Sequence, residues 1–340
     1  MPGLTEAEID ALFEPLELFE KLGLAVSGGP DSLGLMLLAA AWARRPGRPE
    51  LFVYTVDHCL RTEAAAEAEM VVREAQALGL PARSLRWAGE KPSTGIQAAA
   101  RRARYRLMHD AMEEDGVAIL VTAHHLADQA ETVLMRLAHG SGIEGLRGMD
   151  AMSLVEDCDV YRPLLGVRPE ILRQVVSDAG LSAAYDPSNT DQHYERVRWR
   201  LMLPALEAMG ITLERLGKFA HRMDEASSAI RSAAEAAYPR IVTPVSGERM
   251  DLSFPAFRIE PAPVAAMVLR EVLELVCAEP KRSPPLGALE MLSGRLQKID
   301  PVKPITLNGC VVSSDGETIS VRRERPRSAA VKAARANTPN

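Results

Sequence analysis

The sequence is poor in the features that mark several classes of protein. Its four cysteines are scattered and form no Cys-x-x-Cys pair, which argues against a zinc or iron–sulfur site and fits a reduced cytoplasm. No apolar run approaches the ~20 residues that a membrane-spanning helix needs. Residues 1–20 are acidic and amphipathic, unlike the basic and then apolar start of a signal peptide. We therefore expect a cytoplasmic protein that does not associate with a membrane.

The sequence also lacks an overall excess of basic residues, since its net charge is −6. Its arginines are nevertheless clustered between Arg101 and Arg106 and again between Arg196 and Arg200. Local patches of this kind bind polyanions even on an acidic protein, although each patch fits equally well with a solvated face. Residues 326–340 form a basic tail rich in Ala, Pro and Asn, and this composition predicts disorder.

Strand and helix patterns alternate in the first part of the chain. Apolar, strand-like runs occupy residues 22–26, 51–56, 82–87 and 117–121, and helical patterns separate them. This order predicts the α/β class with a doubly wound parallel sheet, which binds ligands at the carboxyl ends of its strands. After Met209 the pattern changes to long helices with one final pair of strands. We therefore expect a catalytic domain at 1–209 and a smaller, mostly helical α+β domain at 210–325.

A short polar segment follows the first strand directly and consists of Ser27, Gly28, Gly29, Pro30, Asp31 and Ser32. Two adjacent glycines let backbone N–H groups approach an anion, and the start of the next helix adds unpaired donors. The lysine of a Walker motif is missing, so Asp31 is predicted to hold Mg²⁺ on a bound phosphate. The residue types alone fit equally a plain turn in which Asp31 or Ser32 caps the helix.

Two further polar clusters, Asp57-His58 and His124-His125, follow later strands and should meet the first cluster in one crevice. Asp128 and Glu131 stand three residues apart and so share a helix face. With His124 they could hold a metal or transfer protons, although their spacing also fits a helix start with an acidic first turn.

A basic and aromatic cluster, Arg101, Arg104 and Tyr105, occurs at helical spacing in the long helix predicted over residues 95–114. These side chains are predicted to line the crevice for RNA, ATP or a carboxylate. The alternative is that Tyr105 belongs to the core and that the arginines cap strands or pair with acidic residues.

The segment Ser27–Ser32 matches S-G-G-x-D-S, the signature of the PP-loop ATP pyrophosphatases, which split ATP into AMP and pyrophosphate. The segment from His124 to Met149 resembles the central motif of one family in that group, the tRNA(Ile)-lysidine synthases. Further blocks resemble motifs of the same family in the same order: residues 56–61, 95–105, 162–165, 186–189 and 196–204. Four residues depart from the family pattern: Cys59, Ala127, His139 and Val197.

The resemblance implies an enzyme that joins free L-lysine to C2 of the wobble cytidine in tRNA(Ile) with a CAU anticodon. The cytidine O2 first attacks the α-phosphate of ATP and releases pyrophosphate; the lysine amine then attacks C2 and releases AMP. ATP and Mg²⁺ are the implied cofactors, and the C-terminal domain is expected to bind the tRNA. No obligatory protein partner is implied, and a homodimer stays open.

Matching positions also suggest roles for individual residues. ATP binding is assigned to Ser27, Gly28, Gly29, Pro30, Asp31, Ser32, Asp57 and His58. Catalysis is assigned to Asp31, His124, Asp128, Glu131 and Arg198, with Asp31 as the metal ligand. Contacts to tRNA or lysine are assigned to Arg61, Arg101, Arg104, Tyr105, Arg136 and Ser141. Two other functions stay open: a tRNA thiolation enzyme, which would need cysteine pairs, and a non-catalytic adenine-nucleotide-binding module, which would have no need of these acidic residues together.

Overall fold

The chain divides into two units, and the boundary between them falls inside one long helix, α9 (Leu213–Ile241). The first unit comprises residues 1–140 and 145–222, and the second comprises 141–144 and 223–340. The structure is a computed structural model that describes residues 3–59, 62–89, 91–92, 94–184, 191–277, 283–298 and 301–324. The tail predicted at 326–340 lies outside the described residues. The domains expected at 1–209 and 210–325 stay a prediction.

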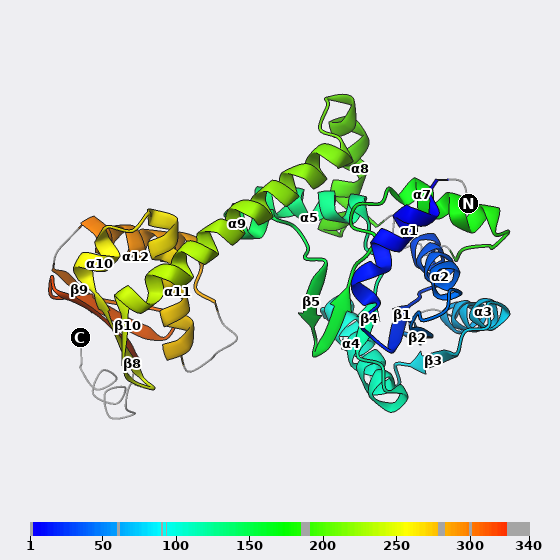
Figure 1. Ribbon diagram of the computed structural model, residues 1–340, viewed down its shortest axis with the longest axis horizontal. Coiled ribbons are helices and arrows are strands. Elements are labelled where there is room, and N and C mark those ends of the chain that lie inside the picture. Colours follow the sequence, from blue (N-terminus) through cyan, green and yellow to red (C-terminus); the bar gives the residue numbers. More distant parts are fainter. Residues whose placement is uncertain are drawn as a thin grey trace, which may run out of the picture. The chain divides into compact units, whose positions relative to one another are not determined.

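A six-stranded sheet with the order β3-β2-β1-β4-β6-β5 forms the centre of the first unit (Figure 1). Its strands are β1 (Lys21–Ala25), β2 (Glu50–Asp57), β3 (Ala82–Arg86), β4 (Ile119–Val121), β5 (Met152–Val155) and β6 (Cys158–Tyr161). Neighbouring strands pair in parallel, except that the edge strand β5 runs antiparallel to β6. The predicted doubly wound parallel sheet is therefore confirmed.

The helices of this unit precede, connect and follow the strands. They are α1 (Glu6–Phe13), the 3-10 helix η1 (Glu14–Leu16), α2 (Pro30–Ala43), α3 (Ala64–Ala77), α4 (Ile96–Asp115), α5 (Leu126–Ala138), α6 (Ile143–Leu146), α7 (Pro169–Asp178) and α8 (Glu195–Ala208). None of the helices in the described part of the chain is long and apolar enough to span a membrane.

The order in which the chain adds strands to the sheet reverses between β1 and β4, and this reversal positions the site. From β1 the chain builds β2 and β3 on one side and then crosses to β4 on the other side, so that Leu22 pairs with both Leu51 and Ile119. Ligands of open α/β sheets bind where the strand order reverses, at the carboxyl ends of the strands. The segments after β1 and β4, which begin at Val26 and Thr122, therefore flank the expected crevice.

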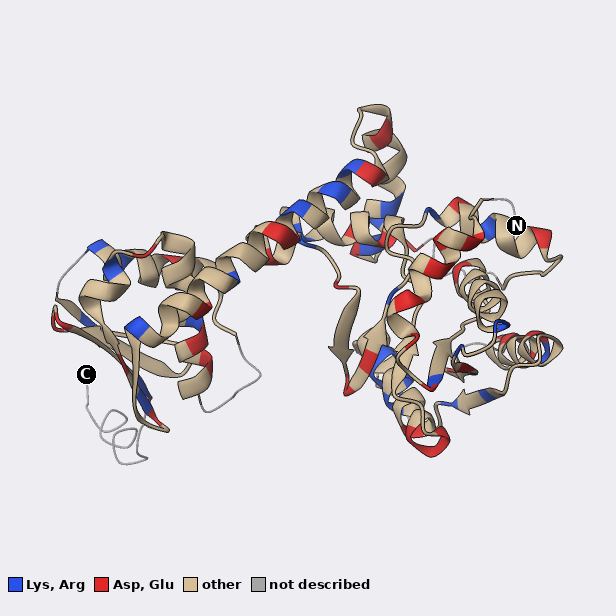
Figure 2. Cartoon of the chain, in the orientation of Figure 1, with Lys and Arg blue, Asp and Glu red and all other residues tan. Residues whose placement is uncertain are grey.

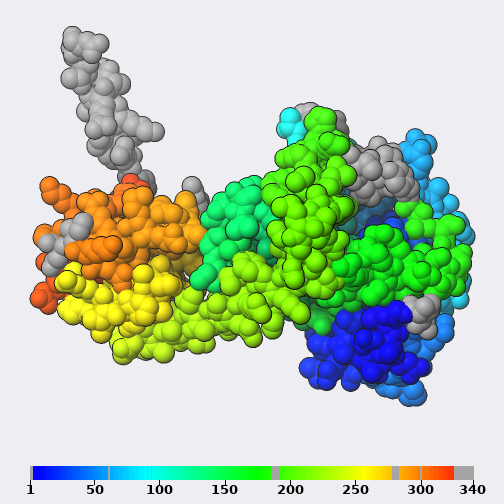
Figure 3. Space-filling view, turned by 90° about the horizontal axis from the view of Figure 1, so that it is seen from above, coloured from blue at the N-terminus to red at the C-terminus, as the bar shows by residue number. Residues whose placement is uncertain are grey.

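Helix α2 is buried on nearly all sides because it packs against the sheet, α1 and α7. Gly34 allows the close contact with α7, since a Cβ atom there would lie 3.2 Å from the backbone oxygen of Leu172. At the other end of α2, Trp42 stacks on Phe13 with ring centroids 5.2 Å apart. The N-terminal segment, blue in the space-filling view, thus covers part of this unit's outer surface (Figure 3).

The second unit contains a five-stranded antiparallel sheet with the order β7-β8-β11-β10-β9. Its elements are β7 (Val242–Ser246), β8 (Arg249–Ser253), α10 (Phe254–Arg258), α11 (Ala262–Val276), α12 (Leu286–Lys298), β9 (Val302–Leu307), β10 (Cys310–Ser314) and β11 (Thr318–Arg323). Alternate strand residues, such as Val312, Ile319 and Val321, are buried in one cluster with apolar side chains of α11 and α12. The expected helices are confirmed, and so is a final pair of antiparallel strands, β10 and β11, but the sheet has five strands rather than two.

Candidate active site

The loop between β1 and α2 has the geometry of an anion cradle. Gly28 adopts a φ of +85°, and a Cβ atom there would lie 3.2 Å from Met70 Cε. The Ser32 hydroxyl accepts a hydrogen bond from the Ser27 backbone N–H at 3.1 Å and donates one to the Gly29 carbonyl at 3.0 Å. These bonds hold the loop in a closed turn around its two glycines.

The start of α2 leaves donors available for a ligand. Gly29 is the N-cap and Pro30 the first helical residue, and no side chain caps the helix. The plain capping turn by Asp31 or Ser32 is therefore not what forms. The amides of the first helical turn have no acceptor within the helix, so they and the positive end of the helix dipole favour a bound anion.

The cluster at the end of β2 is built around Asp57, which is buried. Its carboxylate accepts a hydrogen bond from the backbone N–H of Cys59 at 2.8 Å. Cys59 has a φ of +51°, a conformation that glycine adopts more easily, which explains why its family position usually carries glycine. His58 meets Trp87 edge to face, with ring centroids 6.2 Å apart.

His125, which the sequence analysis placed at the crevice without giving it a role, links the loop to α5. It is the N-cap of α5: Nδ1 accepts from the backbone N–H of Asp128 at 3.3 Å, and the His125 N–H donates to Asp128 Oδ2 at 3.0 Å. Its Nε2 lies 3.4 Å from Asp31 Oδ2. Burial by itself lowers the pKa of His125, but the bond to Asp31 and the charge of Asp128 outweigh it and raise the pKa. The spacing H-x-x-D is a capping-box signal that could have revealed this residue.

His124 has the opposite electrostatic environment. Its Nδ1 lies 2.9 Å from the Thr122 hydroxyl. Burial has the largest effect on the pKa of His124. Together with the charges of Arg162, Arg196 and Arg101, and against the opposing charge of Asp128, it lowers this pKa to about 4. His124 is therefore neutral near pH 7.

Two acids and two arginines meet where α5 contacts α8. The fully buried Glu131 accepts from Arg196 Nε at 2.8 Å and from Arg200 Nε at 2.7 Å. Asp128 Oδ1 lies 3.6 Å from the Nη2 atoms of both arginines. Burial raises the pKa of Asp128, but the charges of His125 and Arg196 and the bond from the His125 backbone N–H lower it to a greater extent. The carboxylate of Asp128 is thus ionised, and Glu131 fixes both guanidinium groups.

Comparison with known proteins agrees with this geometry. The family model of the PP-loop domain matches residues 3–206. The tRNA(Ile)-lysidine synthase of Rhodopseudomonas palustris is 40% identical over 97% of this chain and 98% of its own length. The protein of that name from Methylobacterium nodulans is 42% identical over 90% of this chain and 91% of its own. The chain belongs to the tRNA(Ile)-lysidine synthases of the PP-loop family.

A solved structure supports the fold. The U34-tRNA thiolase NcsA from Methanococcus maripaludis matches with a TM-score of 0.55 over 64% of this chain and 78% of that one. Because the two sequences are only 14% identical, this likeness concerns the fold alone.

This member of the lysidine synthase family brings several predicted residues together and leaves others apart. Asp31, His124, Asp128 and Glu131 lie at the β1/β4 crevice or are joined to it by the contacts above. Arg198 does not join them: it is exposed on another face of α8 and donates to the carbonyls of Gln192 and His193. Its neighbours on α8, Arg196 and Arg200, face the acids instead, and the sequence analysis assigned them no role.

The residues predicted to contact tRNA or lysine have different surroundings. Arg136 donates to the carbonyls of Gly145 and Gly148 and so braces the loop that follows α5. Ser141 lies in the short segment that belongs to the second unit. Arg61 lies outside the described residues, as does the motif at 186–189. Tyr105 is buried in the core as the alternative held, with the Arg101 guanidinium 5.0 Å from the centroid of its ring.

The residues of the loop fit a magnesium ion that is held mainly by the phosphates of ATP. No group of three His, Cys, Asp or Glu side chains that could hold a metal occurs in the described part of the chain. Mg²⁺ needs no such group when phosphate oxygens complete its coordination beside one or two carboxylates. Asp31, whose side chain is 37% exposed beside the loop, can serve as that carboxylate.

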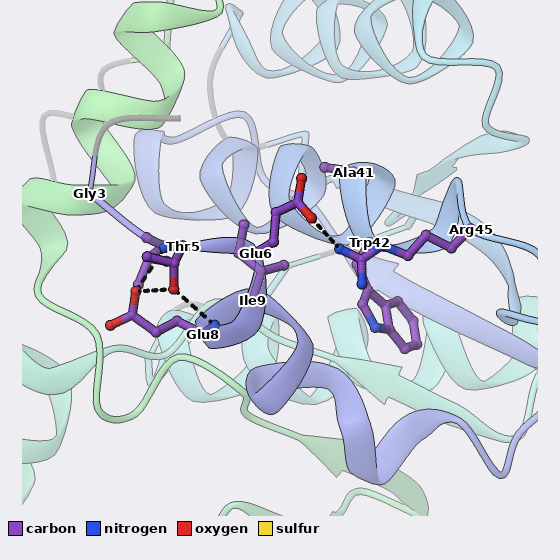
Figure 4. A pocket seen from close by; sticks show the side chains of 9 residues that line it. Gly3, Thr5, Glu6, Glu8, Ile9, Ala41, Trp42 and Arg45 are labelled. Carbon is purple, nitrogen blue, oxygen red and sulfur yellow. Dashed lines mark hydrogen bonds and ion pairs between the residues drawn. The ribbon is translucent and has the colours of Figure 1, made fainter.

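A separate pocket of about 590 Å³ opens between α1 and the C-terminal end of α2 (Figure 4). Trp42, Arg45, Glu6 and Thr5 are among its lining residues, and none of the loop residues is. Trp42 and the loop lie at opposite ends of α2, so this pocket is not part of the active site.

Proposed function

We propose that this protein uses ATP to join free lysine to C2 of the wobble cytidine in tRNA(Ile) with a CAU anticodon. The observation that carries the proposal is the 3.4 Å approach of His125 Nε2 to Asp31 Oδ2. This approach joins the phosphate loop after β1 to the histidine and acid cluster after β4. Nucleotide binding and the second half-reaction can therefore share one crevice at the reversal of the sheet.

The first step is the attack of cytidine O2 on the α-phosphate of ATP. Negative charge grows on the departing pyrophosphate, so donors directed at it stabilise the transition state. The N–H groups at the start of α2 and in the turn at Gly28 and Gly29 supply such donors. Asp31 would hold Mg²⁺, which supplies positive charge to the phosphates when it is bound. The flexible anticodon loop allows the cytidine to leave its stack and reach this site.

The second step is the attack of the lysine amine on C2, with AMP as the leaving group. Lysine enters as an ammonium, so its amine must lose a proton before it attacks. The ionised Asp128 is suited to attract the ammonium, whose proton then passes to water. The neutral His124 is suited to form a hydrogen bond with the amine that results. We assign to Arg196 and Arg200, which Glu131 positions, the phosphate contact that the sequence suggested for Arg198.

The tRNA requires a basic surface, and the start of α9 offers one within the first unit. Lys218 and Arg222 stand one helical turn apart and are exposed, and the ribbon in Figure 2 marks Lys and Arg positions in blue along this part of the helix. Phosphate contacts made by such residues release counterions, so tRNA binding should weaken steeply as salt increases. The C-terminal domain, a cytoplasmic location and a homodimer stay predictions.

The proposal is tested by measuring AMP formation with ATP, lysine and tRNA(Ile) and with each omitted in turn. AMP should form only in the complete mixture, and the mass of the anticodon nucleoside should rise by that of lysine less one water. A thiolated nucleoside would support the thiolation alternative, although the four cysteines are free and three of them are buried. Binding of ATP without turnover would support the non-catalytic alternative.

The role of Asp31 is tested separately by Asp31→Asn, which keeps the size of the side chain but removes its charge. Pyrophosphate release should fall at least a hundredfold, about 2.7 kcal/mol of transition-state stabilisation. Turnover close to wild type over a range of Mg²⁺ concentrations would refute the metal role.

A further inference from the structure

Three arginines gather where α4 meets the end of β6. Arg162 directly follows β6, and the parallel register of β4 with β6 places it next to the segment Thr122–His124. Arg101 and Arg104 lie one turn apart on α4, which is joined to β6 by a bond from the Cys158 thiol to the Tyr105 carbonyl at 3.4 Å. We call Arg101, Arg104 and Arg162 the arginine cluster.

The arginine cluster has donors without acceptors. Arg162 is only 6% exposed, and its Nη1 donates to the Asp150 carbonyl and the Ser153 hydroxyl, both at 2.8 Å. The Nε atoms of Arg162 and Arg104 are buried and have no hydrogen-bond partner among the described residues. The nearby Asp150 carboxylate already accepts from Arg147 at 2.8 Å. Buried donors on charged groups without acceptors are costly, so the cluster is incomplete without an anion.

The electrostatic effects within the cluster agree with a missing anion. Burial lowers the pKa of Arg162 and of Arg104, and the charge of Arg101 lowers both further. The phenol of Tyr105 opposes this effect at both arginines. Like charges held this close repel one another, and a bound anion would remove that repulsion.

The position of the cluster separates it from the phosphate loop. The loop follows β1 and Arg162 follows β6, with β4 between them. Two strand spacings amount to about 10 Å, so the same phosphate group cannot occupy both places. An extended lysine places its ε-amine about 7–8 Å from its α-carboxylate, and the side chains that line the two places extend toward each other across the remaining distance. An amine at the crevice and a carboxylate at the cluster are therefore compatible with one amino acid.

We propose that the arginine cluster binds the α-carboxylate of the amino acid substrate, an inference that rests on the proposed function. The planar guanidinium matches a carboxylate through paired hydrogen bonds. Because Arg162 is recessed, a small free ligand reaches it more easily than the backbone of a folded RNA. The cluster thus selects free lysine over amines that lack a carboxylate.

The test compares kcat/KM for lysine with kcat/KM for lysinamide, in which the carboxylate is replaced by a neutral amide. The wild type should prefer lysine by about ten- to a hundredfold, the worth of one or two hydrogen bonds to a charged group. Arg104→Gln, which removes one charge, should lower this ratio at least fivefold. Arg106→Gln is the matched control, since Arg106 is exposed on the same helix, and it should keep the wild-type ratio.

Equal use of both amines by the wild type would overturn the inference, and so would an unchanged ratio in Arg104→Gln. If Arg104→Gln lowers the use of both amines equally because tRNA binds more weakly, the cluster would be assigned to an RNA phosphate instead. Arg162→Lys provides a second variant and should lower the ratio as well. These failures differ from failure of the proposed function, in which the wild type would form no amine-dependent AMP with tRNA(Ile).

Discussion

Replacing Glu131 by Gln tests whether the buried acid organises the arginines of the active site. Glu131 is fully buried and accepts hydrogen bonds from Arg196 and Arg200 at 2.8 and 2.7 Å. Gln has the same shape but no charge, and its NH₂ group cannot accept from an arginine. At least one of the two strong bonds is therefore lost, and both guanidinium groups are left with Asp128 as their nearest acid.

The magnitude follows from the kind of bond that is lost. A hydrogen bond to a charged group contributes about 1.5–3 kcal/mol, and breaking a fully buried ion pair costs about 3–5 kcal/mol. The side chains of Arg196 and Arg200 are 40% and 42% exposed, so water compensates them in part. We therefore expect the free energy of unfolding to fall by about 2–4 kcal/mol.

The assay is urea unfolding followed by tryptophan fluorescence. All three tryptophans, Trp42, Trp87 and Trp199, lie in the first unit, so the signal reports that unit alone. With a slope of about 2–3 kcal/mol per molar urea, the midpoint should shift by about 1 M.

The matched control is Glu214→Gln, because Glu214 also accepts from an arginine, Arg168, but its side chain is 46% exposed. An exposed pair of this kind contributes less than about 1 kcal/mol. Equal losses in the two variants, or a loss below about 1 kcal/mol in Glu131→Gln, would refute the idea that burial makes Glu131 the anchor.

Three further predictions concern single residues. Gly28→Ala and Gly47→Ala both place a Cβ at a positive φ, +85° and +79°, so each should lower the free energy of unfolding by about 1–2 kcal/mol. Only Gly28→Ala should also weaken ATP binding, since nothing lies within 4 Å of a Cβ at Gly47. The pKa of His124 is about 4 in the folded chain, below its ordinary 6.5, so the unfolded chain takes up a proton first as the pH falls. The folded state therefore loses stability between these two pH values. In His124→Gln, the unfolding free energies measured at pH 7 and at pH 5 should differ less than in the wild type. Gln129→Leu should lower the unfolding free energy by about 2 kcal/mol, because the Met149 N–H, which now donates to Gln129 at 2.7 Å, would lose its acceptor.

Local sequence predicted most of the first unit because its strands are short apolar runs between helical patterns. The hairpin of β10 and β11 was expected, but three other hairpins were missed because their signals lie in the turns. Glu156 and Asp157 both adopt positive φ in the two-residue turn between β5 and β6. Asn308 and Gly309 do the same between β9 and β10, and this Asn-Gly pair is a strong hairpin signal that the sequence analysis overlooked. The proline-containing segment 242–253 also forms a hairpin, with Pro244 in the edge strand β7, where proline is tolerated.

The site could be predicted in its location but not in its pairing. The motifs place Asp31, Asp128 and Glu131 near the reversal of the strand order, yet sequence spacing cannot show which of these acids is paired with arginines. The helical period does separate Arg198 from Arg196 and Arg200, since residues four apart share a face and residues two apart do not. Applied to residues 196–200, this rule alone would have shown that Glu131 can be faced either by Arg196 and Arg200 or by Arg198, but not by all three.

The two adjacent histidines show how the fold divides one motif into two functions. Acids surround His125, and its pKa is raised; arginines surround the buried His124, and its pKa is lowered to about 4. A pair of titratable groups driven apart in this way marks distinct acid and base roles. His125 is bonded on both sides, to Asp31 and to Asp128, and so positions the loop against α5. Burial and the nearby arginines keep the ring of His124 neutral, so it can form a hydrogen bond with the attacking amine without adding positive charge to the site.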